Sequence, residues 1–477
     1  MTEKRLPRTT PESVGVPSAV IGKVIDAWKA KGVGVHGLMF MRHGKVFAEG
    51  WYDPYRPELT HMLFSLSKSF TSTAIGFAVQ EGLLTVEDYV ADIFADKLVC
   101  EPCANMRKMQ VKHLLTMNTG HSKEPNVIFH KEVEDWVKRF MESYVDHEPG
   151  TLFVYNTAAT YMLSAIITKL TGKRVGEYLT PRLFEPLGIE GWRFETCPAG
   201  IDTGGYGLNV HLEDIAKFGT FLLNRGSFGG EQLLNPEWID EATARHTYST
   251  GGGNDWIQGY GYQFWRCQPE GVYRGDGAYG QYCIVVPKLD MVIAMNEGTG
   301  WLQDPLDVLW EVLLPAVQEE ALAEDPAAVE EMNARLSALT VGTLDGRADA
   351  DFAYAGVTYE LSPNALGIKA VSVEKNAFTF ETAENTVVLP FAYAGFAEAK
   401  TGIQPDFCNS FGFFYEQAAT NGVWKDDSTL ALRIAWNTTP FIDDVTLAFD
   451  ECGVVVEWER NYSMAPEKAF RIFGRKA

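Results

Sequence analysis

The sequence has little of what marks a nucleic-acid-binding or membrane-spanning protein. Lys and Arg number 41 against 63 Asp and Glu, which leaves a formal net charge of −22. Nucleic acids and anionic membranes both require a basic surface, so we expect neither as a partner. No apolar run reaches the roughly 18 residues that would span a bilayer. Residues 1–24 also lack a signal-peptide core and a small-residue cleavage site, and we therefore expect a cytoplasmic protein.

Cysteine is scarce, with seven among 477 residues, and the odd number and scattered positions fit reduced thiols. Cys100 and Cys103 form the single C-x-x-C. Because no second pair or nearby histidine completes a zinc site, we interpret them as two reduced thiols in a loop. None of the nine histidines, at positions 36, 43, 61, 113, 121, 130, 147, 211 and 246, lies in an H-E-x-x-H or comparable ligand spacing. We expect no metal and no other cofactor.

The chain is too long for one ordinary core, so we expect two domains. Residues 1–322 place helical segments between two predicted hairpins, at about 33–52 and 281–296. This order favours an α+β domain with one antiparallel sheet flanked by helices. Its expected helices begin after Phe64, close at glycines 82, 120, 172 and 226, and end with a helix at about 305–318.

The remaining third of the chain has a different character. Residues 323–340 are rich in Ala and Glu and predict a helical connector. Residues 341–477 contain about eight short alternating strands separated by turn residues, which predicts an antiparallel all-β barrel or sandwich.

A Ser-x-x-Lys motif at Ser65 and Lys68 lies where a helical pattern begins. Three residues apart on a helix, the two side chains share one face, so the amine can reach the hydroxyl. The positive end of the helix dipole favours a developing oxyanion and disfavours an ammonium, which helps Lys68 act as a base. The same residues are also compatible with an ordinary helix whose N-terminus is capped by a serine. The second match, Ser372 to Lys375, lies in alternating strand sequence and is interpreted as a strand and its turn.

Two further segments add weight to the motif. Tyr155 stands just before a long apolar helix, where its phenolate would be stabilised and could exchange protons with a serine. The segment from Tyr273 to Gln281 is a glycine-rich run leading into a strand. Glycines there would let a substrate lie against the strand backbone, and a backbone N–H could complete an oxyanion hole. Each segment alone is also typical of ordinary packing or of a loop.

In this order, the three segments resemble the serine β-lactamase and penicillin-binding superfamily. The resemblance is closest to the class C-like branch, which also holds family VIII esterases, D-aminopeptidases and 6-aminohexanoate-dimer hydrolases, and it covers roughly residues 10–320. Matching text includes MFMRHGKVFAEGWY, VKHLLTMNTGHS and GYGLNVHLEDIAKFGTFLLNRG. The resemblance implies Ser65 as the acylated nucleophile, Lys68 as its activating amine, and Tyr155 as the base that also protonates the leaving group.

The sequence departs from the family pattern twice. Thr157 stands where the family has Asn, and Asn156, one place early, either contacts substrate or caps the helix. The strand motif has no Lys-Thr-Gly; its nearest cation is Arg274, and Asp276 on the same side of the strand would offset that charge. Together with Asn156, we take Arg274, Gly275, Asp276 and Gly277 as candidate substrate-binding residues.

These departures favour a serine hydrolase that cleaves a small ester or amide. A true β-lactamase or D-amino-acid peptidase stays open as the alternative, as does a non-catalytic protein that keeps the fold for binding. Sequence order also leaves a Ser-His-Asp triad open, although no serine lies in a G-x-S-x-G elbow. The oligomeric state is not indicated.

Overall fold

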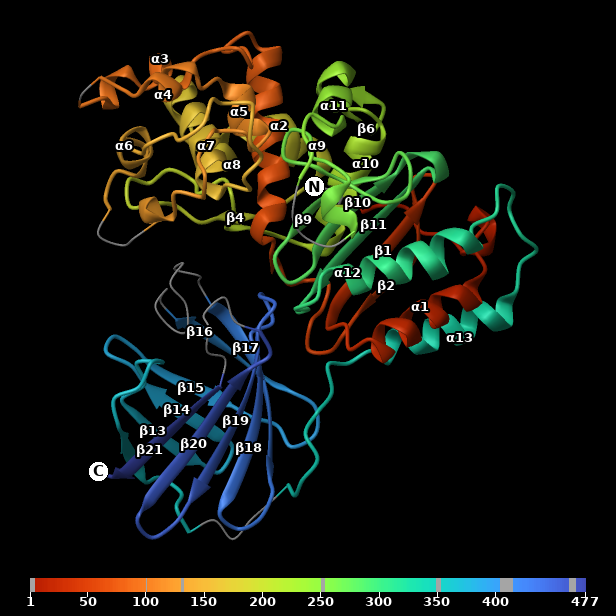
Figure 1. The fold of residues 1–477 in the computed structure, drawn as a ribbon. Helices are drawn as coiled ribbons and strands as arrows, with labels where there is room; N and C mark the ends of the chain where they lie inside the picture. The colour runs from red at the N-terminus through yellow and green to blue at the C-terminus, as the bar shows by residue number, and fades with distance from the viewer. Residues whose placement is uncertain are drawn as a thin grey trace.

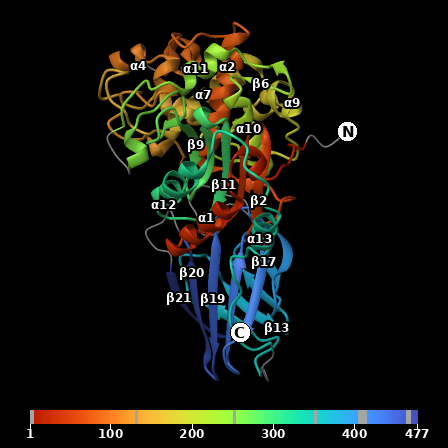
Figure 2. The same ribbon diagram turned by 90° about the vertical axis from the view of Figure 1, so that its right-hand side faces the viewer.

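The computed structural model describes residues 5–99, 101–129, 133–249, 254–348, 353–403, 415–462 and 469–477. Cys100, His130 and residues 411–414, which belong to the region of expected alternating strands, lie outside these ranges. A helix-rich domain with one six-stranded sheet and two small sheets lies at one end of the molecule and an all-β domain at the other, as two perpendicular views show (Figures 1 and 2).

The first sheet has six antiparallel strands in the order β2-β1-β11-β10-β9-β8. It joins the two expected hairpins, because β1 pairs with β11, with Leu38 opposite Met295. Alternate side chains enter two cores, one against α1, α12 and α13 and the other against α10 and the helical region. The strands are β1 Val35–Arg42, β2 Lys45–Trp51, β8 Trp265–Arg266, β9 Tyr273–Gly277, β10 Gln281–Val286 and β11 Met291–Glu297.

The helical region sits on one face of this sheet, and most of its expected helices are confirmed. Its main helices are α2 Ser67–Gln80, α5 Val111–Leu115, α7 Thr157–Thr171 and α10 Leu212–Leu223; α1 Ser18–Ala30 and α12 Gln303–Val308 cover the opposite face. Gly172 closes α7 in a left-handed conformation. The expectation that a helix runs to Gly120 is wrong, because α5 ends at Leu115 and Met117 takes a φ of +58°.

The C-terminal domain is a ten-stranded antiparallel sheet whose edge strands β15 and β16 lie against each other, so that it curls into a near-barrel. Its interior is apolar and aromatic. Helix α13 Pro326–Ser337, in the expected connector, packs on α1. The strands are β12 Thr358–Leu361, β13 Ala370–Glu374, β14 Ala377–Glu381, β15 Thr386–Pro390, β16 Ala397–Ile403, β17 Tyr415–Trp424, β18 Thr429–Ala435, β19 Ile442–Phe449, β20 Gly453–Arg460 and β21 Ala469–Lys476.

Two smaller expectations are also answered by the fold. The second Ser-x-x-Lys match lies on β13 and its turn, as expected, with Ser372 opposite Thr379 of β14. Within the described ranges, none of the helices combines the length and apolar character needed to cross a lipid bilayer.

Candidate active site

Ser65 lies on a single 3₁₀ turn, Phe64–Leu66, that leads directly into α2. Phe64 has a φ of +48°, a conformation that a bulky residue adopts only when its surroundings hold it there. Its neighbour Leu63 is tied to the helical region, since its amide donates to the Leu208 carbonyl at 2.9 Å. Phe64 and Leu66 are buried while Ser65 is only half-buried, so the hydroxyl sits at the edge of the core.

Lys68 is on the first turn of α2 and faces Ser65. Its Nζ lies 2.9 Å from Ser65 Oγ, 2.7 Å from the Gly205 carbonyl and 3.4 Å from Thr157 Oγ1. The side chain is only 1% exposed. Burial lowers the pKa of Lys68 to about 7, against the opposing pull of the Glu124 and Asp276 carboxylates. The amine is therefore poised to gain or lose a proton near neutral pH.

Tyr155 closes the other side of Ser65, just before α7. Its ring stacks on Trp265 at 5.6 Å between centroids, and Lys68 Nζ lies 5.0 Å from the ring centroid. Burial raises the pKa of Tyr155 well above its usual value, although the hydrogen bond with Ser65 opposes that rise. The expected stabilisation of a phenolate is thus outweighed by desolvation, and the resting side chain is a neutral phenol.

Two residues that sequence reasoning did not assign to the site also lie beside Lys68. Thr157, which stands where the family has Asn, approaches the amine with its hydroxyl. The Glu124 carboxylate accepts the Thr157 backbone N–H at 2.5 Å and raises the pKa of both Lys68 and Tyr155. Thr157 could have been found from its place in the family pattern. Glu124 lies in an irregular loop outside any motif, so no sequence signal marks it.

Asn156 is fully buried as the N-cap of α7. Its amide oxygen accepts the Ala159 N–H at 3.1 Å, and its amide nitrogen donates to Thr119 Oγ1 at 3.2 Å. Of the two roles that the sequence left open, the helix cap is the one the geometry displays.

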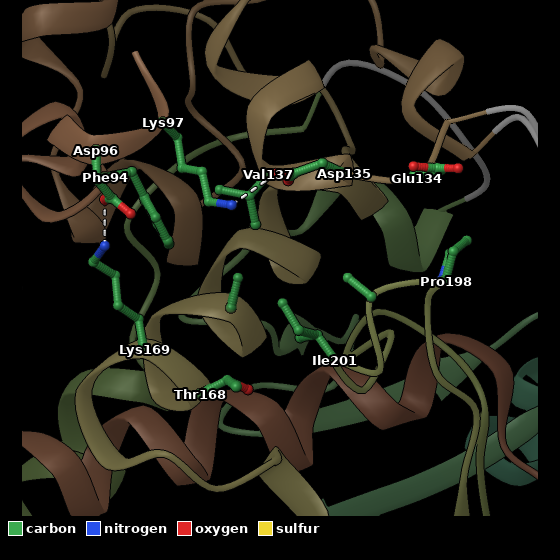
Figure 3. A pocket seen from close by; sticks show the side chains of 12 residues that line it. Phe94, Asp96, Lys97, Glu134, Asp135, Val137, Thr168, Lys169, Pro198 and Ile201 are labelled. Carbon is green, nitrogen blue, oxygen red and sulfur yellow. Dashed lines mark hydrogen bonds and ion pairs between the residues drawn. The ribbon is translucent and has the colours of Figure 1, made fainter.

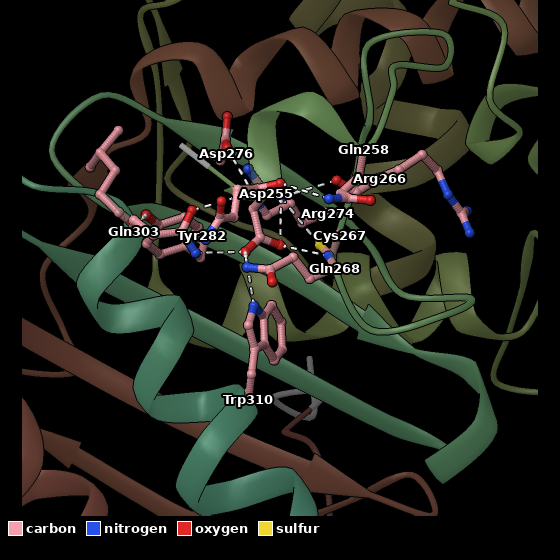
Figure 4. A network of polar contacts seen from close by, with 12 residues as sticks. Asp255, Gln258, Arg266, Cys267, Gln268, Arg274, Asp276, Tyr282, Gln303 and Trp310 are labelled. Atoms are coloured by element: carbon pink, nitrogen blue, oxygen red, sulfur yellow. Dashed lines mark hydrogen bonds and ion pairs between the residues drawn. The ribbon is translucent and has the colours of Figure 1, made fainter. Parts of the chain in front are cut away.

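Arg274 and Asp276 are joined by an ion pair on β9, with 2.9 Å between Arg274 Nε and Asp276 Oδ2. This contact confirms the expectation that the two side chains share one side of the strand. Arg274 is completely buried and lies 3.7 Å from Asp255 (Figure 4). Its guanidinium carbon lies 4.5 Å from the centre of the Trp256 ring. Asp255 in turn accepts hydrogen bonds from Gln268, Gln303 and Trp310. The guanidinium is thus committed to an internal network.

The glycines of the strand motif let β9 approach the Ser65 turn closely. A Cβ at Gly275 would lie 2.5 Å from both Leu66 Cδ1 and Ser69 Oγ, and one at Gly277 would lie 2.1 Å from the Leu63 carbonyl. Any larger residue would push the strand away from Ser65. Because Gly275 and Gly277 have no side chains, β9 can pack directly on the Phe64–Leu66 turn, and its backbone lies beside Ser65.

A separate hollow of about 600 Å³ lies between the 94–97 segment, α6 (Trp136–Met141), α7 and the 198–201 loop (Figure 3). Its floor is apolar, and its lysines are already paired, Lys97 with Asp135 at 2.7 Å and Lys169 with Asp96. None of the predicted site residues lines it. Among the described residues, no group of three or more His, Cys, Asp or Glu side chains could hold a metal ion.

Known proteins resemble this chain in sequence and in fold. The family model for β-lactamase matches residues 22–297. The chain is 23% identical to 6-aminohexanoate-dimer hydrolase of Paenarthrobacter ureafaciens over 54% of this chain and 70% of that protein. The octameric penicillin-binding protein homologue from Pyrococcus abyssi has a similar fold, with a TM-score of 0.50 and 17% identity over 95% of this chain and 99% of that one. A D-stereospecific amidohydrolase from Streptomyces sp. gives a TM-score of 0.50 at 17% identity, over 62% and 98%.

Proposed function

Because the chain belongs to the β-lactamase family, we propose that it is a serine hydrolase that forms an acyl-enzyme on Ser65 and cleaves a small ester or amide. One observation carries the proposal: the Lys68 amine lies 2.9 Å from Ser65 Oγ, in surroundings that lower its pKa to about 7. A general base works best when its pKa is close to the working pH, and this amine meets that condition. The hydrolase names of the relatives support the same class of reaction.

In the proposed first half-reaction, neutral Lys68 accepts the proton of Ser65 Oγ, which attacks the substrate carbonyl carbon. The resulting oxyanion lies at the N-terminal end of α2 and beside β9, where backbone dipoles stabilise it. Tyr155, held as a neutral phenol, gives its proton to the departing alcohol or amine as the carbonyl–heteroatom bond breaks. The proton held by Lys68 then replaces the one that Tyr155 has lost.

In the second half-reaction, water adds to the acyl carbon and the Ser65 ester bond breaks. Neutral Lys68 takes the proton of the attacking water and returns it to Ser65 Oγ, which restores the resting site and releases the carboxylic acid. No step needs a metal or cofactor.

The burial of Arg274 favours an uncharged substrate over one that carries a carboxylate. A β-lactam carries a carboxylate that must be neutralised when it leaves water. The strand cation that would serve it is paired with Asp276 and lies against Asp255. A neutral ester needs no such cation, so we expect kcat/KM for p-nitrophenyl butyrate to exceed that for nitrocefin.

The test combines a covalent probe with a substrate panel. A fluorophosphonate probe followed by mass spectrometry should label Ser65 in the unmodified protein; no labelling together with no turnover would favour a non-catalytic binding protein. The panel compares p-nitrophenyl butyrate, nitrocefin and a D-alanyl anilide. A larger kcat/KM for nitrocefin or for the anilide would make β-lactamase or D-amino-acid peptidase the leading function.

A further inference from the structure

The connection between β18 and β19 of the near-barrel docks beside the nucleophile. The Thr438 carbonyl accepts the backbone N–H of Met62 at 2.9 Å, three residues before Ser65. The Thr439 carbonyl accepts the Tyr55 hydroxyl at 3.1 Å. Met62 and Phe64 are part of the hydrophobic core that fills the near-barrel. The C-terminal domain is therefore packed directly against the segment that carries Ser65.

Phe441, at the end of this connection, completes a cluster of three rings with Phe64 and Tyr279. The ring centroids of Phe64 and Tyr279 are 5.4 Å apart, and Phe441 lies 6.2 Å from the first and 5.4 Å from the second, all three edge-on. Phe64 directly precedes Ser65, and Tyr279 follows the β9 glycines. Both have a positive φ, +48° and +65°. Two residues with positive φ, one beside Ser65 and one after the β9 glycines, thus both contact one ring from the other domain.

Phe441 is itself held rigidly by a buried ion pair. The Arg460 guanidinium lies 4.6 Å from the Phe441 ring and makes two hydrogen bonds to Asp443, at 2.7 and 2.8 Å. A third hydrogen bond joins Arg460 to the Tyr415 hydroxyl at 3.0 Å. Bidentate pairing of this kind fixes direction as well as distance. The ring therefore presents a fixed surface to Phe64 and Tyr279.

We propose that Phe441 is a positioning residue, through which the C-terminal domain holds Phe64 and Tyr279 in their left-handed conformations and so sets Ser65 against the β9 backbone. A non-glycine residue in this region of φ is strained, and its conformation persists only where neighbouring residues enforce it. This inference rests on the proposed function of Ser65, because positioning is of consequence only if Ser65 reacts.

The test compares Phe441→Leu and Phe441→Ala with Phe449→Leu and Phe449→Ala in the full chain. Phe449 is the last residue of β19, the strand that begins directly after Phe441, and it is also buried, but it packs on Tyr354 and Tyr359 inside the near-barrel. The leucine variants keep most of the packed volume if the alanine variants fail to fold. Three quantities are measured: hydrogen exchange of peptides covering 61–66 and 276–281, the rate of Ser65 labelling by a fluorophosphonate, and kcat and KM for p-nitrophenyl butyrate.

The Phe441 variants should raise hydrogen exchange in both peptides. They should also lower the rate of Ser65 labelling and kcat by about tenfold or more, with KM little changed. A small misplacement of reacting groups slows a reaction by factors of this size. The Phe449 variants should melt at a similarly reduced temperature but keep kcat within about twofold. Equal effects at both positions, or unchanged exchange and kcat in the Phe441 variants, would overturn the inference. If the unmodified protein shows neither labelling nor turnover, the proposed function fails, and the exchange data alone still decide the positioning role.

Discussion

The two largest antiparallel sheets of this protein bury their residues in different ways. In the six-stranded sheet, every residue of β1, β10 and β11 is buried, because helices cover both faces. In the near-barrel, β19 and β20 alternate between buried and more exposed positions, because only the inner face is packed. The central strands β1, β10 and β11 therefore have no solvent face on which a charged side chain could be placed without cost.

Yet the domain with the covered sheet carries most of the buried charge around the proposed reaction. Lys68, Asp255, Arg274 and Asp276 are all at least nine-tenths buried there. Among the described residues of the near-barrel, Arg460 and Asp443 form a comparable buried pair, which lies where the near-barrel meets the helix-rich domain. Burying a charged side chain lowers the free energy of unfolding unless the charge is well paired, and buried groups with shifted pKa values are concentrated at functional sites. From this contrast we expect the chemistry proposed above to take place in the helix-rich domain, with support from the surface where the near-barrel packs against it.

Serine replacement tests this contrast most strongly, since each domain has a Ser-x-x-Lys match. We expect Ser65→Ala to lower ester kcat/KM by at least about a thousandfold, because the nucleophile is lost, with little change in unfolding. Ser372→Ala on β13 should leave activity unchanged. Steady-state kinetics and thermal melting of both variants check this. Activity of the Ser65 variant above about a tenth of the unmodified value would remove Ser65 from the mechanism.

Lysine replacement tests whether Lys68 acts as a base. With a pKa of about 7, the amine is charged and inactive below that pH and neutral above it, so acylation should rise with pH through about 7 and then level off. Lys68→Arg should lower kcat by about a hundredfold, because a guanidinium stays charged. The control is Lys169→Arg, at a surface ion pair with Asp96, which should leave kcat unchanged. An active Lys68→Arg variant would mean that only positive charge is needed.

Arginine replacement compares buried with exposed charge in the two domains. Arg274→Met leaves Asp255 and Asp276 buried without their cation and should lower the free energy of unfolding by about 3–5 kcal/mol. Arg433→Met removes a partly exposed pair with Asp444 on the near-barrel and should cost about 1 kcal/mol or less. Urea denaturation measures both. Equal, small losses would mean that the Arg274 network contributes little to folding.

Much of the architecture could be predicted from the sequence because it depends on local pattern. The hairpin turn at His43-Gly44, the α7 boundary at Gly172 and the alternation of the C-terminal strands are all encoded within a few residues. The close approach of β9 to Ser65 depends on contacts between segments some two hundred residues apart. The network around Arg274 depends on the segment that carries Asp255 and Trp256, which no local pattern predicts. Glu124 enters the site through an irregular loop, so neither periodicity nor a motif could mark it.

The smallest expected effect concerns Asn156, whose two possible roles give different kinetic results. As the N-cap of α7 its oxygen satisfies a helix N–H, so Asn156→Ala should lower the free energy of unfolding by about 1 kcal/mol, and Asn156→Ser, which keeps an acceptor, should regain most of that loss. Because the side chain is fully buried, KM for p-nitrophenyl butyrate should stay the same in both variants. A rise in KM in both, with stability unchanged, would instead identify Asn156 as a substrate contact and would imply that the α7 N-terminus opens when substrate binds.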